Sequence, residues 1–235
     1  MKTRNTRRGG EPRSDRPARP ARPALPIDAA WVEGAAAEHL ARYSSTRAHL
    51  KQMLLGRIRR AKLKGRPAAE DIAEIIEAVL DRHVALGTLN DAAWAEMKAR
   101  SLTRRGVASA VVKQRLREKG VPDATAAMVA VADEMRGPAS DAEDVPTDLV
   151  AACVWARRKR IGPFSRDEKH DPNAGDDAPV STDRNALRAA RDAERAAEQK
   201  ILASMGRAGF SFTIARQVLQ LDRDEADALL QKLPG

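Results

Sequence analysis

The chain has 235 residues, enough for one or two ordinary domains, and its composition narrows the class of protein. Aromatic residues make up only 3% of it, and Ala, Leu, Arg, Glu and Lys dominate, which disfavours a β-sandwich core and predicts an all-α fold. The net charge of +9 predicts an acidic partner, either a nucleic acid or an acidic protein surface. The single cysteine, Cys153, excludes an internal disulfide, and no apolar run is long enough to span a membrane, so we expect a cytoplasmic protein.

Residues 1–26 are predicted to be a disordered, basic, Pro-rich tail. They contain eight Lys or Arg residues against two acidic ones, together with five prolines and almost nothing to bury. Such a segment cannot offset the entropy that it would lose on ordering. Two interpretations remain open: a solubilising extension and a nucleic-acid-binding arm.

Residues 27–87 are expected to form a first unit of three helices. Asp28 suits the N-cap of its first helix, and residues 44–46 offer caps for the second. Pro67 suits the first turn of the third helix. Apolar residues share one face of the second helix at Leu50, Met53, Leu54, Ile58 and Ala61. The third helix has an apolar stripe at Ile72, Ile75, Ile76, Val79, Leu80 and Leu86.

Residues 88–136 are expected to form a second three-helix unit. Either Thr88 or Asn90 caps its first helix, on which Trp94 and Met97 face inward, and Asp123 caps its third. Residues 137–235 are expected to hold a linker, a third unit and a C-terminal helix. A mobile insertion at about 162–183 precedes a long polar helix, and the last two helices begin after Ser211 and Asp222.

The three units share a trio of residues at offsets 0, 4 and 8. The trios are Leu50, Leu54 and Ile58; Val112, Leu116 and Gly120; and Ile201, Met205 and Gly209. A unit of this size cannot bury its own apolar face, so neighbouring units must stack to share a core. We therefore expect an elongated, curved tandem array of three three-helix units.

Segments of each unit resemble the RecX family, and the second unit does so most closely. It carries Leu86-Gly87-Thr88-Leu89-Asn90-Asp91, then Trp94, Ala95, Arg100, Arg105-Gly106 and Arg115-Leu116-Arg117-Glu118-Lys119-Gly120-Val121. The first unit has Leu40-Ala41-Arg42 followed by Ser45, Arg47 and Leu50, and the third has Arg207-Ala208-Gly209-Phe210-Ser211-Phe212. The resemblance covers about residues 36–220.

The resemblance implies a non-enzymatic, monomeric regulator that needs no cofactor. It implies binding to RecA filaments on DNA, inhibition of RecA's recombinase and ATPase activities, and hence regulation of recombination, DNA repair and the SOS response. An alternative interpretation is an independent helical protein that binds DNA or RNA, because the basic residues would serve either function.

Twelve basic residues, which we call the basic set, are the candidates for partner binding. They are Lys98, Arg100, Arg104, Arg105, Lys113, Arg115, Arg117 and Lys119 in the second unit, Arg57, Arg59 and Arg60 in the first, and Arg207 in the third. Runs of this kind also occur as solvated helix faces, so both interpretations stay open. Phe210, next to Arg207, either contacts the partner or plugs the core.

Nothing in the sequence predicts catalysis or a metal site. The four histidines show no metal-binding spacing, and on a helical wheel His39 and His49 do not share a face. His83 is expected at the boundary of its helix stripe, and Cys153 is expected to be a buried, unreactive thiol. Trp31 and Trp94 occupy apolar positions and are predicted to lie in the core.

Overall fold

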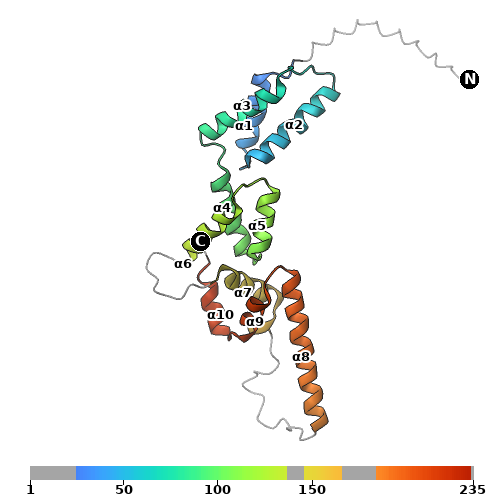
Figure 1. Ribbon diagram of the computed structural model, residues 1–235, viewed down its shortest axis with the longest axis vertical. Coiled ribbons are helices and arrows are strands. Elements are labelled where there is room, and N and C mark those ends of the chain that lie inside the picture. Colours follow the sequence, from blue (N-terminus) through green and yellow to red (C-terminus); the bar gives the residue numbers. More distant parts are fainter. Residues whose placement is uncertain (1–24, 137–145, 166–183, 234–235) are drawn as a thin grey trace, which may run out of the picture.

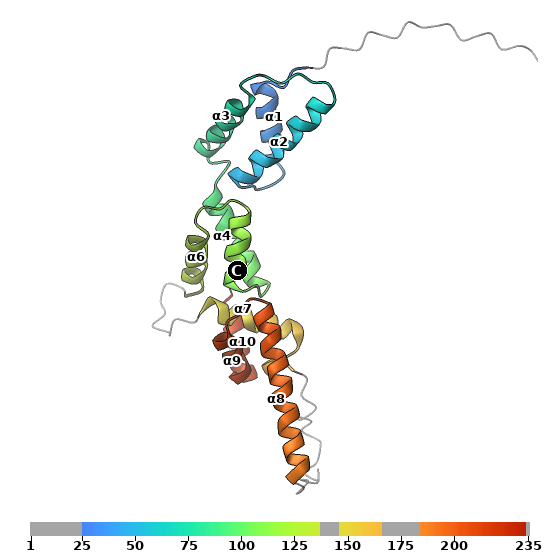
Figure 2. The ribbon, with the colours of Figure 1, turned by 45° about the vertical axis from the view of Figure 1, so that its right-hand side comes forward.

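The computed structural model describes residues 25–136, 146–165 and 184–233, and all regular elements in these segments are helices, as predicted (Figure 1). One isolated bridge, between Ile27 and Ala68, is the only β pairing among the described residues. The helices follow one another down a long axis, and the middle of the array is set off to one side (Figure 2). The fold is an elongated, curved array of three-helix units.

The first three helices are α1 (Ala29–Leu40), α2 (Arg47–Leu63) and α3 (Ile72–Ala85). Asp28 caps α1 by accepting the Trp31 amide at 2.9 Å, and Thr46 caps α2 in the same way. The predicted stripes of α2 and α3 meet in one core. Its fully buried large members are Ile27, Val32, Leu50, Leu54, Ile76 and Leu80.

Two predictions for the third helix were wrong. Pro67 does not begin α3, because its carbonyl accepts the Ile27 amide at 2.8 Å and holds that segment extended against the chain that precedes α1. The helix starts only at Ile72. Leu86 is 65% exposed, since α3 ends before it, and His83 occupies the buried end of the stripe instead.

The next three helices are α4 (Asp91–Arg104), α5 (Ser109–Glu118) and α6 (Ala124–Arg136). Asn90 rather than Thr88 caps α4, accepting the Ala93 amide at 3.0 Å. The core between them is made mostly of small and branched side chains. Its buried members are Ala95, Ala99, Leu102, Val112, Leu116, Val121, Ala124, Ala127, Met128 and Val131.

Several large side chains that were predicted to face inward lie at the edge of the core. Met97 is 47% exposed, which contradicts its predicted inward position. Trp94 and Trp31 are only half-buried and pack against the margins of their cores. In a unit of three helices each helix is covered on one side only, so a ring just off the centre of the stripe keeps one edge in solvent.

The remaining elements are α7 (Thr147–Lys159), the short 3-10 helix η1 (Gly162–Phe164), α8 (Arg184–Arg207), α9 (Phe212–Gln220) and α10 (Arg223–Leu230). They surround a third core, to which the second unit contributes Ala108. The buried members of α7, α8 and α9 include Ala152, Cys153, Trp155, Met205, Ile214 and Val218.

The start of the predicted insertion belongs to the folded unit. Phe164 is only 5% exposed and packs in the third core, so the prediction of mobility was wrong for residues 162–165. Residues 166–183, the N-terminal tail up to residue 24 and residues 137–145 of the linker lie outside the described residues. Ser211 and Asp222 cap α9 and α10 as predicted. Phe210 is buried with its ring edge toward Trp155, so it plugs the core.

Candidate partner-binding surface

The second helices of the three units, α2, α5 and α8, follow one another along the same side of the array (Figure 1). The end of α5 meets the start of α2, where the Thr46 hydroxyl donates to the Lys119 carbonyl at 2.7 Å. A Cβ on Gly120 would lie 2.3 Å from that of Ala48, and one on Gly209 would collide with a side chain of α5. These glycines therefore let the helix ends touch and form one continuous edge.

The basic residues of α5 lie on both flanks of its core-facing stripe. Arg115, Arg117 and Lys119 are exposed, and Lys113 is half-buried. Residues four apart share a helix face, so Lys113 lies with Arg117 and Arg115 lies with Lys119, on either side of the buried Leu116. None of the four side chains forms an ion pair within the described part of the chain.

On α4 the structure separates the basic residues by role. The Arg100 Nε lies 2.5 Å from the Glu134 carboxylate, which ties α4 to α6. Arg104 lies four residues further along the same face and is exposed. Lys98 and Arg105, seven residues apart, share the other side of the helix. Arg100 is thus part of the packing, whereas the other three have no ion-pair partner among the described residues.

The first unit shows the same division between paired and unpaired cations. Arg57 donates to the Glu38 carboxylate at 2.8 Å, and this hydrogen bond and the accompanying charge hold the pKa of Glu38 below its ordinary value. Arg59 and Arg60 are exposed and have no acidic partner among the described residues. Arg207, at the end of α8, is exposed and also has no acidic partner among the described residues. Ten of the twelve members of the basic set are therefore available to a partner.

The histidines form contacts that the sequence analysis missed. His39 of α1 and His49 of α2 lie with their ring centroids 6.1 Å apart, because the two helices pack against each other. The helical-wheel argument was wrong here, since the break at residues 41–46 puts them on different helices. Burial, the charge of His49 and the charge of Arg57 lower the pKa of His39. The lowered pKa favours the neutral imidazole of His39 at the join between α1 and α2.

His83 and Cys153 have structural positions. His83 is 6% exposed, against a predicted boundary position, and its Nδ1 lies 2.9 Å from the Thr88 hydroxyl while its Nε2 lies 3.4 Å from Glu33. The hydrogen bond with Thr88 links α3 to the loop before α4, whereas Nε2 lies beside Glu33 of α1 without a hydrogen bond. Burial raises the pKa of Cys153 to about 11, which keeps the thiol protonated and a poor nucleophile. Among the described residues no cluster of His, Cys, Asp and Glu could hold a metal ion.

The sequence of this chain is similar to those of known proteins. The family model for the second three-helix domain of RecX matches residues 90–129, which hold α4, α5 and the start of α6. Regulatory protein RecX of Myxococcus xanthus is 34% identical over 194 residues, covering 82% of this chain and 86% of that protein. The chain belongs to the RecX family. Regulatory protein RecX of Agrobacterium fabrum is 25% identical over 205 residues, which cover 87% of this chain and 90% of that protein. No solved structure gives a significant match.

The RecX match falls on the unit in which the sequence resemblance was closest. The matched residues 90–129 include all eight second-unit members of the basic set. Seven of these eight have no ion pair among the described residues, Arg100 being the exception. The family itself is shown by the Myxococcus xanthus protein, whose match extends over 82% of the chain. No helix in the described segments is long and apolar enough to cross a membrane.

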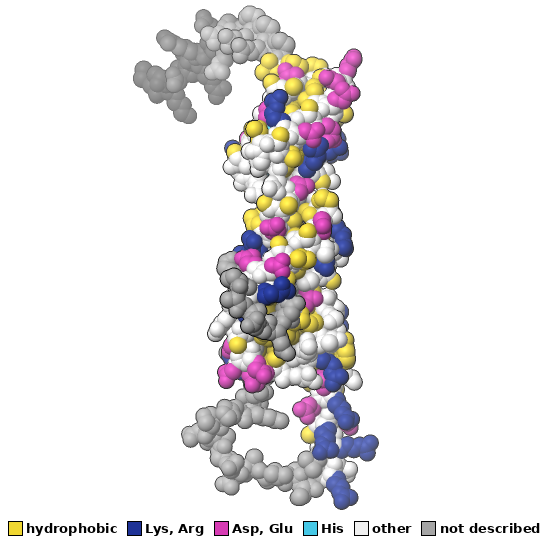
Figure 3. Space-filling view, turned by 60° about the vertical axis from the view of Figure 1, so that its left-hand side comes forward, with side chains coloured by type: hydrophobic (Ala, Val, Ile, Leu, Met, Phe, Trp, Pro, Cys, Tyr) yellow, Lys and Arg dark blue, Asp and Glu magenta, His cyan; other side chains and the backbone are white. Residues whose placement is uncertain are grey.

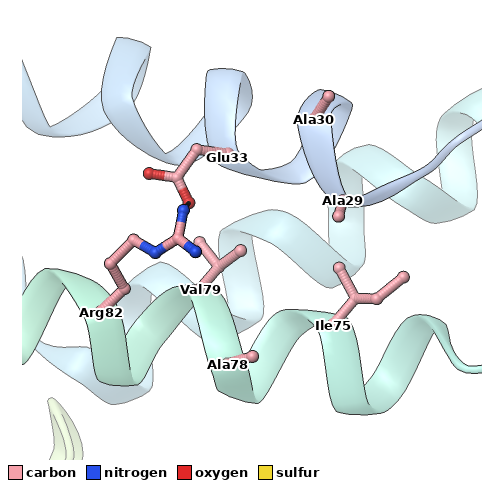
Figure 4. A pocket seen from close by; sticks show the side chains of 7 residues that line it. All are labelled: Ala29, Ala30, Glu33, Ile75, Ala78, Val79 and Arg82. Atoms are coloured by element: carbon pink, nitrogen blue, oxygen red, sulfur yellow. Dashed lines mark ion pairs between the residues drawn. The ribbon is translucent and has the colours of Figure 1, made fainter.

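A hollow of about 260 Å³ lies between α1 and α3 of this RecX family member (Figure 4). Its only charged groups, Glu33 and Arg82, face each other at 3.8 Å and neutralise each other. The rest of the lining is apolar: Ala29, Ala30, Ile75, Ala78 and Val79. The lining has neither a nucleophile nor an unpaired base, so the hollow has no constellation for catalysis.

A second hollow lies where the first two units meet, and the sequence analysis did not anticipate it. Its lining includes Leu40, Tyr43, Trp94 and Met97, and Tyr43 is 62% exposed. Aromatic and Met side chains of this kind are enriched in protein interfaces. The available signal was the apolar spacing of Leu40 and Tyr43, which continues the face of α1 past the residue where the helix ends.

Proposed function

We propose that this protein binds RecA filaments on DNA and inhibits the recombinase and ATPase activities of RecA, so regulating recombination and DNA repair. Its membership of the RecX family carries the proposal, because the relatives that it matches over most of their length are regulatory proteins. The ten unpaired members of the basic set, which lie on α2, α4 and α5 and at the end of α8, supply a surface suited to an acidic, extended partner.

A tandem array suits a repeating partner. A filament presents the same surface at regular intervals, and an elongated protein can make several similar contacts along it. Each exposed charge pair contributes only about 0.2–1 kcal/mol, so useful affinity requires many of them to act together. Linking the contacts in one chain makes each later contact intramolecular and raises the total affinity. This mode of inhibition requires no catalytic group from the chain. A single copy of the chain is enough to occupy each binding site on the filament.

The alternative is an independent DNA- or RNA-binding protein, for which the same cations would contact phosphates. The two functions differ in what they need. Regulation of RecA requires binding to the protein filament, and the affinity of this chain for bare nucleic acid can then be weak. An independent nucleic-acid-binding protein requires tight, salt-sensitive binding with no RecA present.

Two measurements test the proposal. The first titrates the protein into RecA on single-stranded DNA and follows ATP hydrolysis; we expect strong inhibition at substoichiometric amounts. The second measures binding to bare DNA by fluorescence anisotropy without RecA; we expect weaker binding than to the filament. Tight binding to bare DNA with no effect on RecA's ATP hydrolysis would overturn the proposal in favour of the alternative.

A further inference from the structure

The N-terminal part of α8, from Arg184 to Lys200, stands clear of the other described helices. It extends beyond α9 and α10 in two views (Figures 1 and 2). Every side chain described between Arg184 and Lys200 is exposed, whereas the last turns of the helix contribute Met205 to the third core. The projecting part is about 25 Å long at 1.5 Å per residue. An isolated helix of this length is only marginally stable in water. The described side chains of this part are all exposed, so packing does not account for its presence.

Four arginines form a stripe along one face of this projecting helix. Arg184, Arg188, Arg191 and Arg195 are spaced by four, three and four residues, which places them within about 60° of one another around the helix. Their axial separations are about 4.5–6 Å. None of the four is ion-paired within the described residues, and together with Asp192 they line one hollow on the helix. Lys and Arg side chains, drawn dark blue, gather at this projecting end in Figure 3. We call them the α8 stripe.

We propose that the projecting half of α8 is a binding site for the phosphate backbone of double-stranded DNA, separate from the basic set. Arginine presents a planar fork of donors that matches phosphate oxygens. Four such groups in a row can therefore follow a line of phosphates along the DNA backbone. Duplex DNA carries about one negative charge per 1.7 Å of its axis, so each guanidinium in the stripe has a phosphate within reach.

The shape of the helix favours duplex DNA over an acidic protein surface. A helix that is exposed on all sides can enter the major groove, which is about 12 Å wide and admits an α-helix. The other faces of the projecting part carry six alanines, at positions 186, 189, 190, 193, 196 and 197, and three exposed acidic residues, Asp192, Glu194 and Glu198. With five Lys or Arg residues against these three, the segment keeps a net positive charge of +2. A helix that bound a protein surface would instead be expected to carry apolar anchors at the centre of the contact. Alanines allow close approach but offer little to a protein pocket.

The test uses the full chain, a short fluorescent DNA duplex and no RecA. The stripe variant replaces Arg184, Arg188, Arg191 and Arg195 with Gln. The matched control replaces four other exposed cations without ion pairs in the described structure, Lys62, Lys64, Arg157 and Lys159, also with Gln. Gln keeps a helix propensity close to that of Arg, so circular dichroism should show unchanged helical content. Anisotropy titrations at several salt concentrations give the affinity and its salt dependence.

If each stripe arginine contacts one phosphate, the slope of log affinity against log salt should fall by about 3.6 in the stripe variant. The control should lose much less of the slope. A third variant with four Arg→Lys changes should retain most of the slope, because its charge is kept, but should bind more weakly, because the planar fork is lost.

Equal loss in the stripe variant and the control would mean that bulk charge governs binding, and this would overturn the proposal. An unchanged salt slope in the stripe variant would also overturn it. A separate assay of RecA's ATP hydrolysis distinguishes a protein partner: a stripe variant that lost inhibition there but kept its affinity for the duplex would show that the stripe binds a protein instead. These outcomes do not depend on whether the chain inhibits RecA through the basic set, so the two proposals fail separately.

Discussion

The junctions between the first and second units and between the second and third use the same hydrogen bond. At the first, the Arg47 amide at the start of α2 donates to the Asp91 carboxylate of α4 at 2.7 Å. At the second, the Ser109 amide at the start of α5 donates to the Asp148 carboxylate of α7 at 2.7 Å. In each case a carboxylate in the next unit accepts from the free amide at a helix N-terminus, where negative charge is stabilised.

The packing around this shared bond differs. At the second junction both α4 and α6 contact α7, and Ala108 lies within the third core. A Cβ on Gly106 would lie only 2.7 Å from the Trp155 amide nitrogen, so the two backbones are in direct contact. At the first junction no helix of the first unit packs broadly against a described helix of the second, and polar contacts and a hollow lie between them.

The comparison teaches that the same hydrogen bond can join neighbouring units at both junctions without making the junctions equally rigid. Buried apolar surface and close backbone contact do that. We therefore expect the second and third units to move as one body and the first unit to hinge at residues 86–91. Such a hinge would let the array adjust to the pitch of a filament.

The largest difference between the junctions should appear at their tryptophans. Trp155→Ala empties a site that is 7% exposed and removes the ring contact with Phe210, so it should reduce the free energy of unfolding by about 3–5 kcal/mol. Trp94→Ala removes a half-buried ring beside the first hollow and should cost about 1–2 kcal/mol. Urea unfolding measures both; equal costs would show that the first junction is as tightly packed as the second.

Glycine substitutions separate close contact from backbone strain. Gly106→Ala combines a left-handed φ of +72° with a collision against α7 and should cost about 2–4 kcal/mol. Gly87→Ala has a similar φ of +70° but open space around the new Cβ, so it should cost about 1–2 kcal/mol. Thermal unfolding compares them. A Gly106 variant as stable as the Gly87 variant would contradict the close contact at the second junction.

The shared hydrogen bond should matter more where no other cap exists. Ala108 offers α5 no side-chain cap, so Asp148→Ala should cost about 1 kcal/mol. Thr46 already caps α2, so Asp91→Ala should have a smaller effect on stability. Its main effect should be on hinge motion, seen as broader distance distributions between spin labels on the first and second units. Unchanged distributions would show that Asp91 does not restrain the first junction.

Local pattern was sufficient to predict most helices. The spacing of Leu50, Leu54 and Ile58 identified the core face of α2, and the caps Asp28 and Asp222 marked where helices begin. These features depend on residues within one or two turns, which a sequence displays directly. The trio at offsets 0, 4 and 8 also identified the second helix of each unit, and hence the three-unit architecture.

Contacts between distant residues could not be predicted in this way. Nothing local to Arg57 or Arg100 shows that Glu38 and Glu134 would pair with them, and this pairing removes both from the available cations. The exposure of Met97 depends on which side of α4 its neighbours cover. Such facts follow from how helices are placed, and the spacing within one helix does not contain that information.

The measurement that tests the central claim most directly is inhibition of RecA's DNA-dependent ATP hydrolysis by a charge-reversed variant. Arg104, Arg105, Arg115 and Arg117 are exposed and lack ion pairs in the described structure, and all four are changed to Glu. The control changes Lys62, Lys64, Arg157 and Lys159 to Glu, and circular dichroism checks the fold of both. We expect the first variant to lose inhibition and the control to keep most of it, because like charges facing an acidic partner repel it. Full inhibition by the first variant, or equal loss in both, would contradict the assignment of this surface.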